Sequence, residues 1–167
     1  MVGGVVAANA LATLPITDWF TYGTLVYPVT FVTSGLVNQT YGAPAARFVV
    51  LAGFLAGCPL SLLTCSPRVA CASATSFLVS QMLETYVFDR LARAQRPPGH
   101  RRSRWWVPQL TSSTLASALD SALFSALALS GTGLPWVTLG AGDFIVKSVC
   151  AVVALIPFRA ALAVLGK

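Results

Sequence analysis

The stretch GDFIVKSVCAVVALIPFR, from Gly142 to Arg159, decides how the rest of the chain is interpreted. It is long and apolar enough to cross a bilayer, because a helical span needs about 20 residues. Yet Asp143 and Lys147 stand four residues apart near its start. Charged side chains inside a span are costly and by default mark a functional site. The stretch therefore predicts a membrane helix that carries part of such a site.

The composition of the whole chain also indicates a membrane protein. Of the 167 residues, 56% are hydrophobic and 10% are charged, and the mean hydropathy is +0.74. Soluble domains carry about 25% charged residues, and a chain this apolar would expose large adhesive patches in water. The apolar residues form unbroken blocks and do not alternate as in an outer-membrane barrel. We therefore predict an all-α membrane protein.

Six apolar blocks predict six transmembrane helices in a single domain over residues 1–167. They cover about 2–15, 23–37, 45–63, 69–91, 105–129 and 137–165. The first block is short and contains Ala8 and Ala12, a spacing that lets helices approach closely. It lacks the basic residues that begin a signal peptide, and further spans follow it. We therefore expect no cleaved signal peptide.

The basic residues predict the orientation of these helices. Six arginines crowd the connection between the fourth and fifth blocks, within 90–104. Arg47, Arg159 and Lys167 fall on the same side, whereas Arg68 falls on the other side. The positive-inside rule then places both termini in the cytoplasm. The net charge of +6 is thus a topology signal, and we expect no nucleic-acid partner.

No motif predicts catalysis or a bound metal. The four cysteines lack the paired spacing of a zinc site, and we interpret them mainly as small apolar filler. A disulfide between two of the three cysteines within 58–71 stays open. His100 lies in the arginine-rich connection, and no Walker A sequence is present. We therefore predict that the protein is not an enzyme and needs no cofactor.

Three predicted spans each present one polar stripe with at least one charge. Gln81 and Glu84 share a helical face in the fourth span, Asp120 lies on a serine-rich face of the fifth, and Asp143 and Lys147 mark the sixth. Packing should turn these stripes inward around a shared polar cavity. Lys147 can pair with one of the three acids, and the others then need another donor or a ligand. A purely structural clasp between Asp143 and Lys147 stays open as an alternative.

Several longer motifs carry a resemblance to a known family. YPVTFVTSGLVNQTYGAPAARFVV (27–50) resembles the second-span signature of the queuosine precursor transporter family, also called the vitamin uptake transporter family. ASATSFLVSQMLETYVFDRL (72–91), SALDSALFSALAL (117–129) and GDFIVKSVCAVVALIPFR continue that pattern in the same order. One departure is Gly35, which stands where the family usually has an acidic residue, so a carboxylate is missing from the second span.

The resemblance implies a six-helix protein of the bacterial inner membrane, similar in fold to the substrate-binding S-components of energy-coupling-factor transporters. It implies uptake of 7-cyano-7-deazaguanine, 7-aminomethyl-7-deazaguanine or queuine, which are precursors of the tRNA nucleoside queuosine. The alternative is a substrate-capture subunit for a vitamin that needs a separate ATPase module, with Ala8 and Ala12 on its docking helix. An ATPase partner is possible on this resemblance but is not expected.

The polar residues suit the chemistry of a 7-deazaguanine. A carboxylate can accept two N–H groups from the guanidine-like edge of the base, and Glu84 or Asp120 is a candidate for that role. Planar rings bind between aromatic or apolar faces. The predicted substrate site comprises the possible acceptors Glu84 and Asp120, the possible carbonyl donors Gln81, Asn38 and Lys147, Asp143 as the partner of Lys147, and the stacking candidates Phe31, Phe77 and Phe144.

Overall fold

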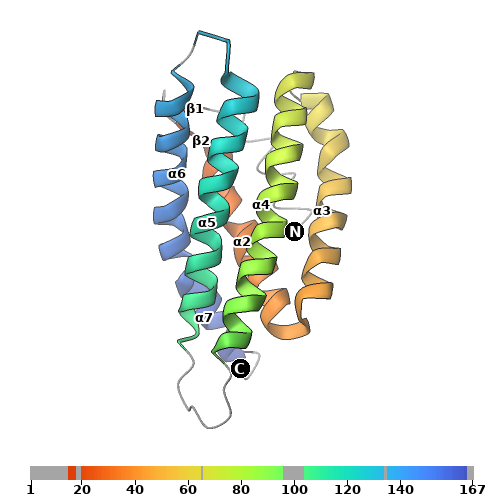
Figure 1. Ribbon diagram of the computed structural model, residues 1–167, viewed down its shortest axis with the longest axis vertical. Coiled ribbons are helices and arrows are strands. Elements are labelled where there is room, and N and C mark those ends of the chain that lie inside the picture. Colours follow the sequence, from red (N-terminus) through yellow and green to blue (C-terminus); the bar gives the residue numbers. More distant parts are fainter. Residues whose placement is uncertain (1–14, 18–19, 65, 96–103, 134, 165–167) are drawn as a thin grey trace.

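The computed structural model describes residues 15–17, 20–64, 66–95, 104–133 and 135–164. Long helices run up and down beside one another in a single bundle (Figure 1). They are α2 (Tyr22–Tyr41), α3 (Ala43–Thr64), α4 (Pro67–Ala94), α5 (Trp106–Phe124) and α6 (Trp136–Val153). A π-helical segment, η1 (Ser125–Leu129), extends α5, and α7 (Leu155–Val164) follows α6.

The second to sixth predicted blocks are therefore helical close to their predicted bounds. The first block lies outside the described residues except for Pro15, so the count of six helices stays a prediction, as does the resemblance to S-components. Three stretches of the described chain are long and apolar enough to cross a membrane: Ala43–Leu63, Trp106–Leu129 and Trp136–Val164. A short antiparallel pair, β1 (Pro15–Thr17) and β2 (Phe20–Thr21), precedes α2 and was not predicted.

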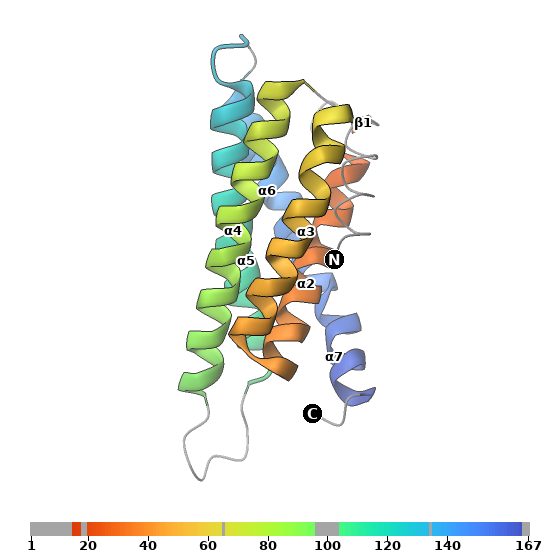
Figure 2. The same cartoon turned by 90° about the vertical axis from the view of Figure 1, so that its right-hand side faces the viewer.

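The sixth block forms one candidate membrane span, Trp136–Val164, which consists of two helices. The helix is interrupted at Ala154, where α6 ends and α7 begins. Pro157 lies within α7 and has no backbone N–H to donate to the carbonyl of Val153, four residues earlier. The interruption lets α7 change direction relative to α6, as the side view shows (Figure 2).

Local sequence explains where the helices turn. Gly42 separates α2 from α3 and has a φ of 86°, a left-handed conformation that favours glycine. At the start of α4, the Ser66 hydroxyl accepts a hydrogen bond from the backbone N–H of Val69, and Pro67 occupies the first turn. These residues place the α2–α3 turn and the α3–α4 turn at opposite ends of the bundle (Figure 1).

The bundle has an apolar exterior and a polar interior, the reverse of a water-soluble protein. Phe48 is 72% exposed and Leu63 is 83% exposed, and many other large apolar side chains also face outward. Buried positions include a long set of hydroxyl, amide and charged side chains from α2, α4, α5 and α6. Lipid can solvate such an exterior, whereas water would not. The structure thus agrees with an α-helical membrane protein.

Two apolar clusters support the polar interior. Val50 and Phe77 pack between α3 and α4. Phe88 and Phe158 join α4 to α7, and Trp105 stacks on Phe158 with ring centroids 6.3 Å apart. The second cluster fixes α7 against the end of the bundle that carries most of the described arginines (Figure 2).

Arg68 lies at the opposite end of the bundle and donates two hydrogen bonds to backbone carbonyls. Arg68, at the start of α4, donates from Nε to the carbonyl oxygen of Leu127 at 3.0 Å and from Nη2 to that of Ser130. These carbonyls lie at the C-terminal end of η1, where helical carbonyls run out of partners, so the guanidinium caps that terminus. Arg68 therefore joins α4 to the end of η1.

Candidate functional site

The interior of the bundle is lined by polar side chains from four helices. The predicted stripes of α4, α5 and α6 do turn inward, and α2 adds a fourth stripe. Its buried members include Thr30 and Ser34 of α2, Ser80, Gln81, Glu84 and Thr85 of α4, Gln109, Ser112, Ser113, Ser117, Asp120 and Ser121 of α5, and Lys147 of α6. A shared cavity at the centre of these groups stays a prediction.

Glu84 lies where α2, α4 and α5 meet. Its side chain is fully buried, and its carboxyl group accepts hydrogen bonds from the Ser34 hydroxyl at 2.8 Å and the Ser112 hydroxyl at 3.3 Å. None of the ion pairs found among the described residues involves Glu84. A buried carboxylate without a cation is costly. The neutral partners of Glu84 leave it as an acceptor suited to a ligand with N–H groups.

Asp120, Asp143 and Lys147 form one ion-pair cluster. Lys147 Nζ lies 2.7 Å from Asp120 Oδ2 and also contacts Asp143 Oδ2. Ser80 donates to Asp120 at 3.2 Å, and Ser121 donates to Asp143 at 2.7 Å. The expectation that only one acid pairs with Lys147 was wrong, because an ammonium carries three donors and can serve both carboxylates. The cluster connects α4, α5 and α6.

Each predicted amide donor uses one of its two N–H groups within the protein. Gln81 Nε2 donates to Thr30 Oγ1 at 2.9 Å, and Asn38 Nδ2 donates to the carbonyl of Thr85 at 2.9 Å. The Gln81 oxygen is buried and has no hydrogen-bond partner among the described residues. Gln81 thus presents an unpartnered acceptor to the interior, although it was predicted as a donor.

The three aromatic candidates lie on three different helices. Phe31 is buried on α2, Phe77 is buried against Val50 between α4 and α3, and Phe144 is partly buried on α6. Phe77 belongs to an apolar cluster, which is a structural role. A stacking role for any of the three stays a prediction.

Gln109 of α5 is a site residue that sequence reasoning missed. It is 2% exposed, and its Nε2 donates to Ser113 Oγ at 2.8 Å and to the Phe31 carbonyl at 3.3 Å. Its oxygen is buried without a partner in the described part of the chain. The i, i+4 spacing of Gln109 and Ser113 on a serine-rich face was the available signal.

The Gln109 amide occupies the space left by Gly35. A Cβ atom at position 35 would lie 1.8 Å from Gln109 Oε1 and 2.9 Å from its Cδ. Any larger residue at position 35 therefore requires Gln109 to move. The structure thus shows that a glycine on α2 and an amide on α5 fit together where the family resemblance had led us to expect a carboxylate.

The cysteines show no pairing in the described chain. Cys58, Cys71 and Cys150 are free, and Cys65 lies outside the described residues. His100, Ala8 and Ala12 also lie outside them.

Comparisons with known proteins indicate the family of this chain. The chain is 26% identical to a probable queuosine precursor transporter of Haemophilus influenzae over 162 residues, covering 82% of this chain and 66% of that protein. It is 22% identical to the queuosine precursor transporter of Escherichia coli K12 over an alignment of 186 positions, gaps included, that covers 95% of this chain and 80% of that protein. No solved structure matches the chain. A family model described as a putative vitamin uptake transporter matches residues 59–162, more than half of the sequence. The chain therefore belongs to the putative vitamin uptake transporter family.

Proposed function

We propose that this protein takes up 7-deazaguanine precursors of queuosine across the bacterial inner membrane. Two relatives that cover most of the chain carry the name queuosine precursor transporter. The observation that carries the proposal at the site is Glu84, a fully buried carboxyl group held by two serine hydroxyls. The substrates are 7-cyano-7-deazaguanine, 7-aminomethyl-7-deazaguanine or queuine.

The buried acceptors of α4 and α5 match in kind the donors of such a base. Besides the Glu84 carboxyl group, the oxygens of Gln81 and Gln109 are buried without partners among the described residues. A 7-deazaguanine presents an N1–H, an amino group and a pyrrole N–H. Buried acceptors that lack partners cost free energy, and a ligand that donates to them recovers that free energy. Asn38 and Lys147 remain the candidates to donate to the carbonyl oxygen of the base.

Thermal stabilisation of the purified protein tests this function. The panel contains the three deazaguanines, with guanine, riboflavin and biotin as controls. A ligand at 100 times its dissociation constant adds about 2.7 kcal/mol to the free energy of unfolding. A shift with a deazaguanine and with none of the controls supports the proposal. A shift with a vitamin alone favours the capture subunit, and no shift with any deazaguanine contradicts the proposal.

The orientation proposed for this function has both termini in the cytoplasm. In the bundle, Arg47, Arg93, Arg104 and Arg159 lie toward the end that holds the α2–α3 turn, whereas Arg68 lies at the opposite end (Figure 1). This asymmetry is the one that the positive-inside rule uses.

A further inference from the structure

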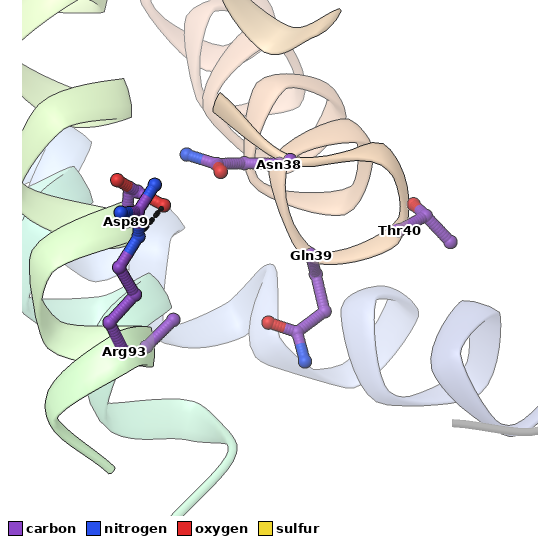
Figure 3. A pocket seen from close by; sticks show the side chains of 7 residues that line it. Asn38, Gln39, Thr40, Asp89 and Arg93 are labelled. Carbon is purple, nitrogen blue, oxygen red and sulfur yellow. Dashed lines mark hydrogen bonds and ion pairs between the residues drawn. The ribbon is translucent and has the colours of Figure 1, made fainter. Parts of the chain in front are cut away.

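A cavity of about 260 Å³ lies between the last turns of α2 and α4. Asn38 and Gln39 line it from α2, and Asp89, Ala92 and Arg93 line it from α4 (Figure 3). Both turns lie at the end of the bundle that carries most of the described arginines (Figure 1). Drug-sized ligands occupy pockets of about 300–1,000 Å³. A slightly smaller cavity suits a small planar molecule such as a bicyclic base.

The lining places donors and acceptors side by side. Arg93 Nε donates to Asp89 Oδ1 at 2.9 Å, and this ion pair uses only one of the five guanidinium donors and part of the acceptor capacity of the carboxylate. Figure 3 shows the Asn38 side chain directed from α2 toward this pair. A carboxylate beside a guanidinium and two amides can bind the N–H edge and the carbonyl of one guanine-type base.

One helical turn separates this cavity from Glu84. Asn38 donates to the carbonyl of Thr85, the residue next to Glu84. Ser34, four residues before Asn38 on α2, donates to the Glu84 carboxyl group. The Asn38–Thr85 hydrogen bond therefore closes α2 onto α4 between the cavity and the buried acceptor.

We propose that the cavity is a second binding site for the transported base, at the arginine-rich end of the bundle. Asp89 accepts the N–H edge of the base, and Arg93 or Gln39 donates to its carbonyl oxygen. The inference rests on the proposed function for the identity of the ligand. It adds a binding site that does not require Glu84.

Calorimetric titration of the purified chain with 7-cyano-7-deazaguanine, a base without a formal charge, tests the second site. Glu84→Gln removes the buried carboxyl group of the first site and should leave one binding event, at the cavity between α2 and α4. Adding Asp89→Asn should weaken that event by at least about tenfold, because a charge-assisted hydrogen bond is lost. Arg90→Gln is the matched control, since Arg90 is exposed and donates to Tyr86 instead of lining the cavity.

The proposal of a second site is wrong if Glu84→Gln abolishes all binding. It is also wrong if the binding event that remains in Glu84→Gln keeps its affinity when Asp89→Asn is added. In either case the wild-type chain still binds the base, and the proposed function stands. If the wild-type chain binds no deazaguanine, the proposed function itself fails, and this site fails with it.

Site-directed labelling gives a second measurement that does not alter the ion pair. Ala92→Cys places a thiol in the cavity lining, and Ala94→Cys places one at an exposed position on the same helix that does not line the cavity. The base should slow maleimide labelling at position 92 several-fold and leave position 94 unchanged, as followed by peptide mass spectrometry. Equal labelling rates at position 92 with and without saturating base would overturn the site.

Discussion

Glu84 is the residue whose surroundings most directly suggest a ligand, because its buried carboxyl group has two hydroxyl donors and no described cation. We predict that Glu84→Gln weakens deazaguanine binding by about tenfold or more, since losing one acceptor oxygen leaves a buried donor of the ligand unsatisfied, which costs about 1–3 kcal/mol. Titration calorimetry measures the change. Glu84→Asp keeps a carboxyl group and should have a smaller effect. An affinity for Glu84→Gln within about twofold of wild type would remove Glu84 from the site.

Gly35 and Gln109 should behave as a coupled pair. Gly35→Ala forces the Gln109 amide away from its bonds to Ser113 and the Phe31 carbonyl. Each neutral hydrogen bond contributes about 1 kcal/mol, partly offset by the better helix propensity of alanine. We expect a loss of about 1–2 kcal/mol in the free energy of unfolding.

A double-mutant cycle checks this coupling. In a Gln109→Ala background the extra methyl group has room, so Gly35→Ala should then be neutral or stabilising. Purely additive effects of the two substitutions would show that the Gln109 amide does not depend on the space at position 35.

At the scale of elements, the Asp120–Lys147–Asp143 cluster joins α4, α5 and α6. Lys147→Met leaves the buried carboxylate of Asp120 and the partly buried carboxylate of Asp143 without their cation, and breaking a buried ion pair costs about 3–5 kcal/mol. We predict a loss of this size in thermal or denaturant unfolding, together with loss of uptake. Val149→Met, at an exposed position on α6, is the matched control. Full transport by Lys147→Met would exclude Lys147 from the site.

At the scale of the whole molecule, the distribution of arginines predicts the topology. A fluorescent reporter that folds only in the cytoplasm should be active when fused after Lys167. A phosphatase reporter that is active only outside the cytoplasm should be active when inserted near Gly133, in the turn between η1 and α6. Exchanging the two reporters is the control, and both should then be inactive. The reverse pattern would invert the orientation derived from the positive-inside rule.

The sequence by itself determined the class of the protein and most of its elements. Blocks two to six are helical near their predicted bounds, because a backbone in lipid must satisfy its hydrogen bonds within each segment. The inward placement of Gln81, Glu84 and Asp120 also followed from their helical spacing. The contact of Asp143 with Lys147 is local, at i, i+4, and was predictable for the same reason.

Only the tertiary structure decided which helices supply the partners. That Lys147 also pairs with Asp120, that Glu84 meets serines from α2 and α5, and that Gln109 fills the space beside Gly35 depend on contacts between helices. Such contacts are set by the rotation and register of one helix against another. Periodicity within a segment determines which face turns inward, but it carries no information about the residue that this face will meet.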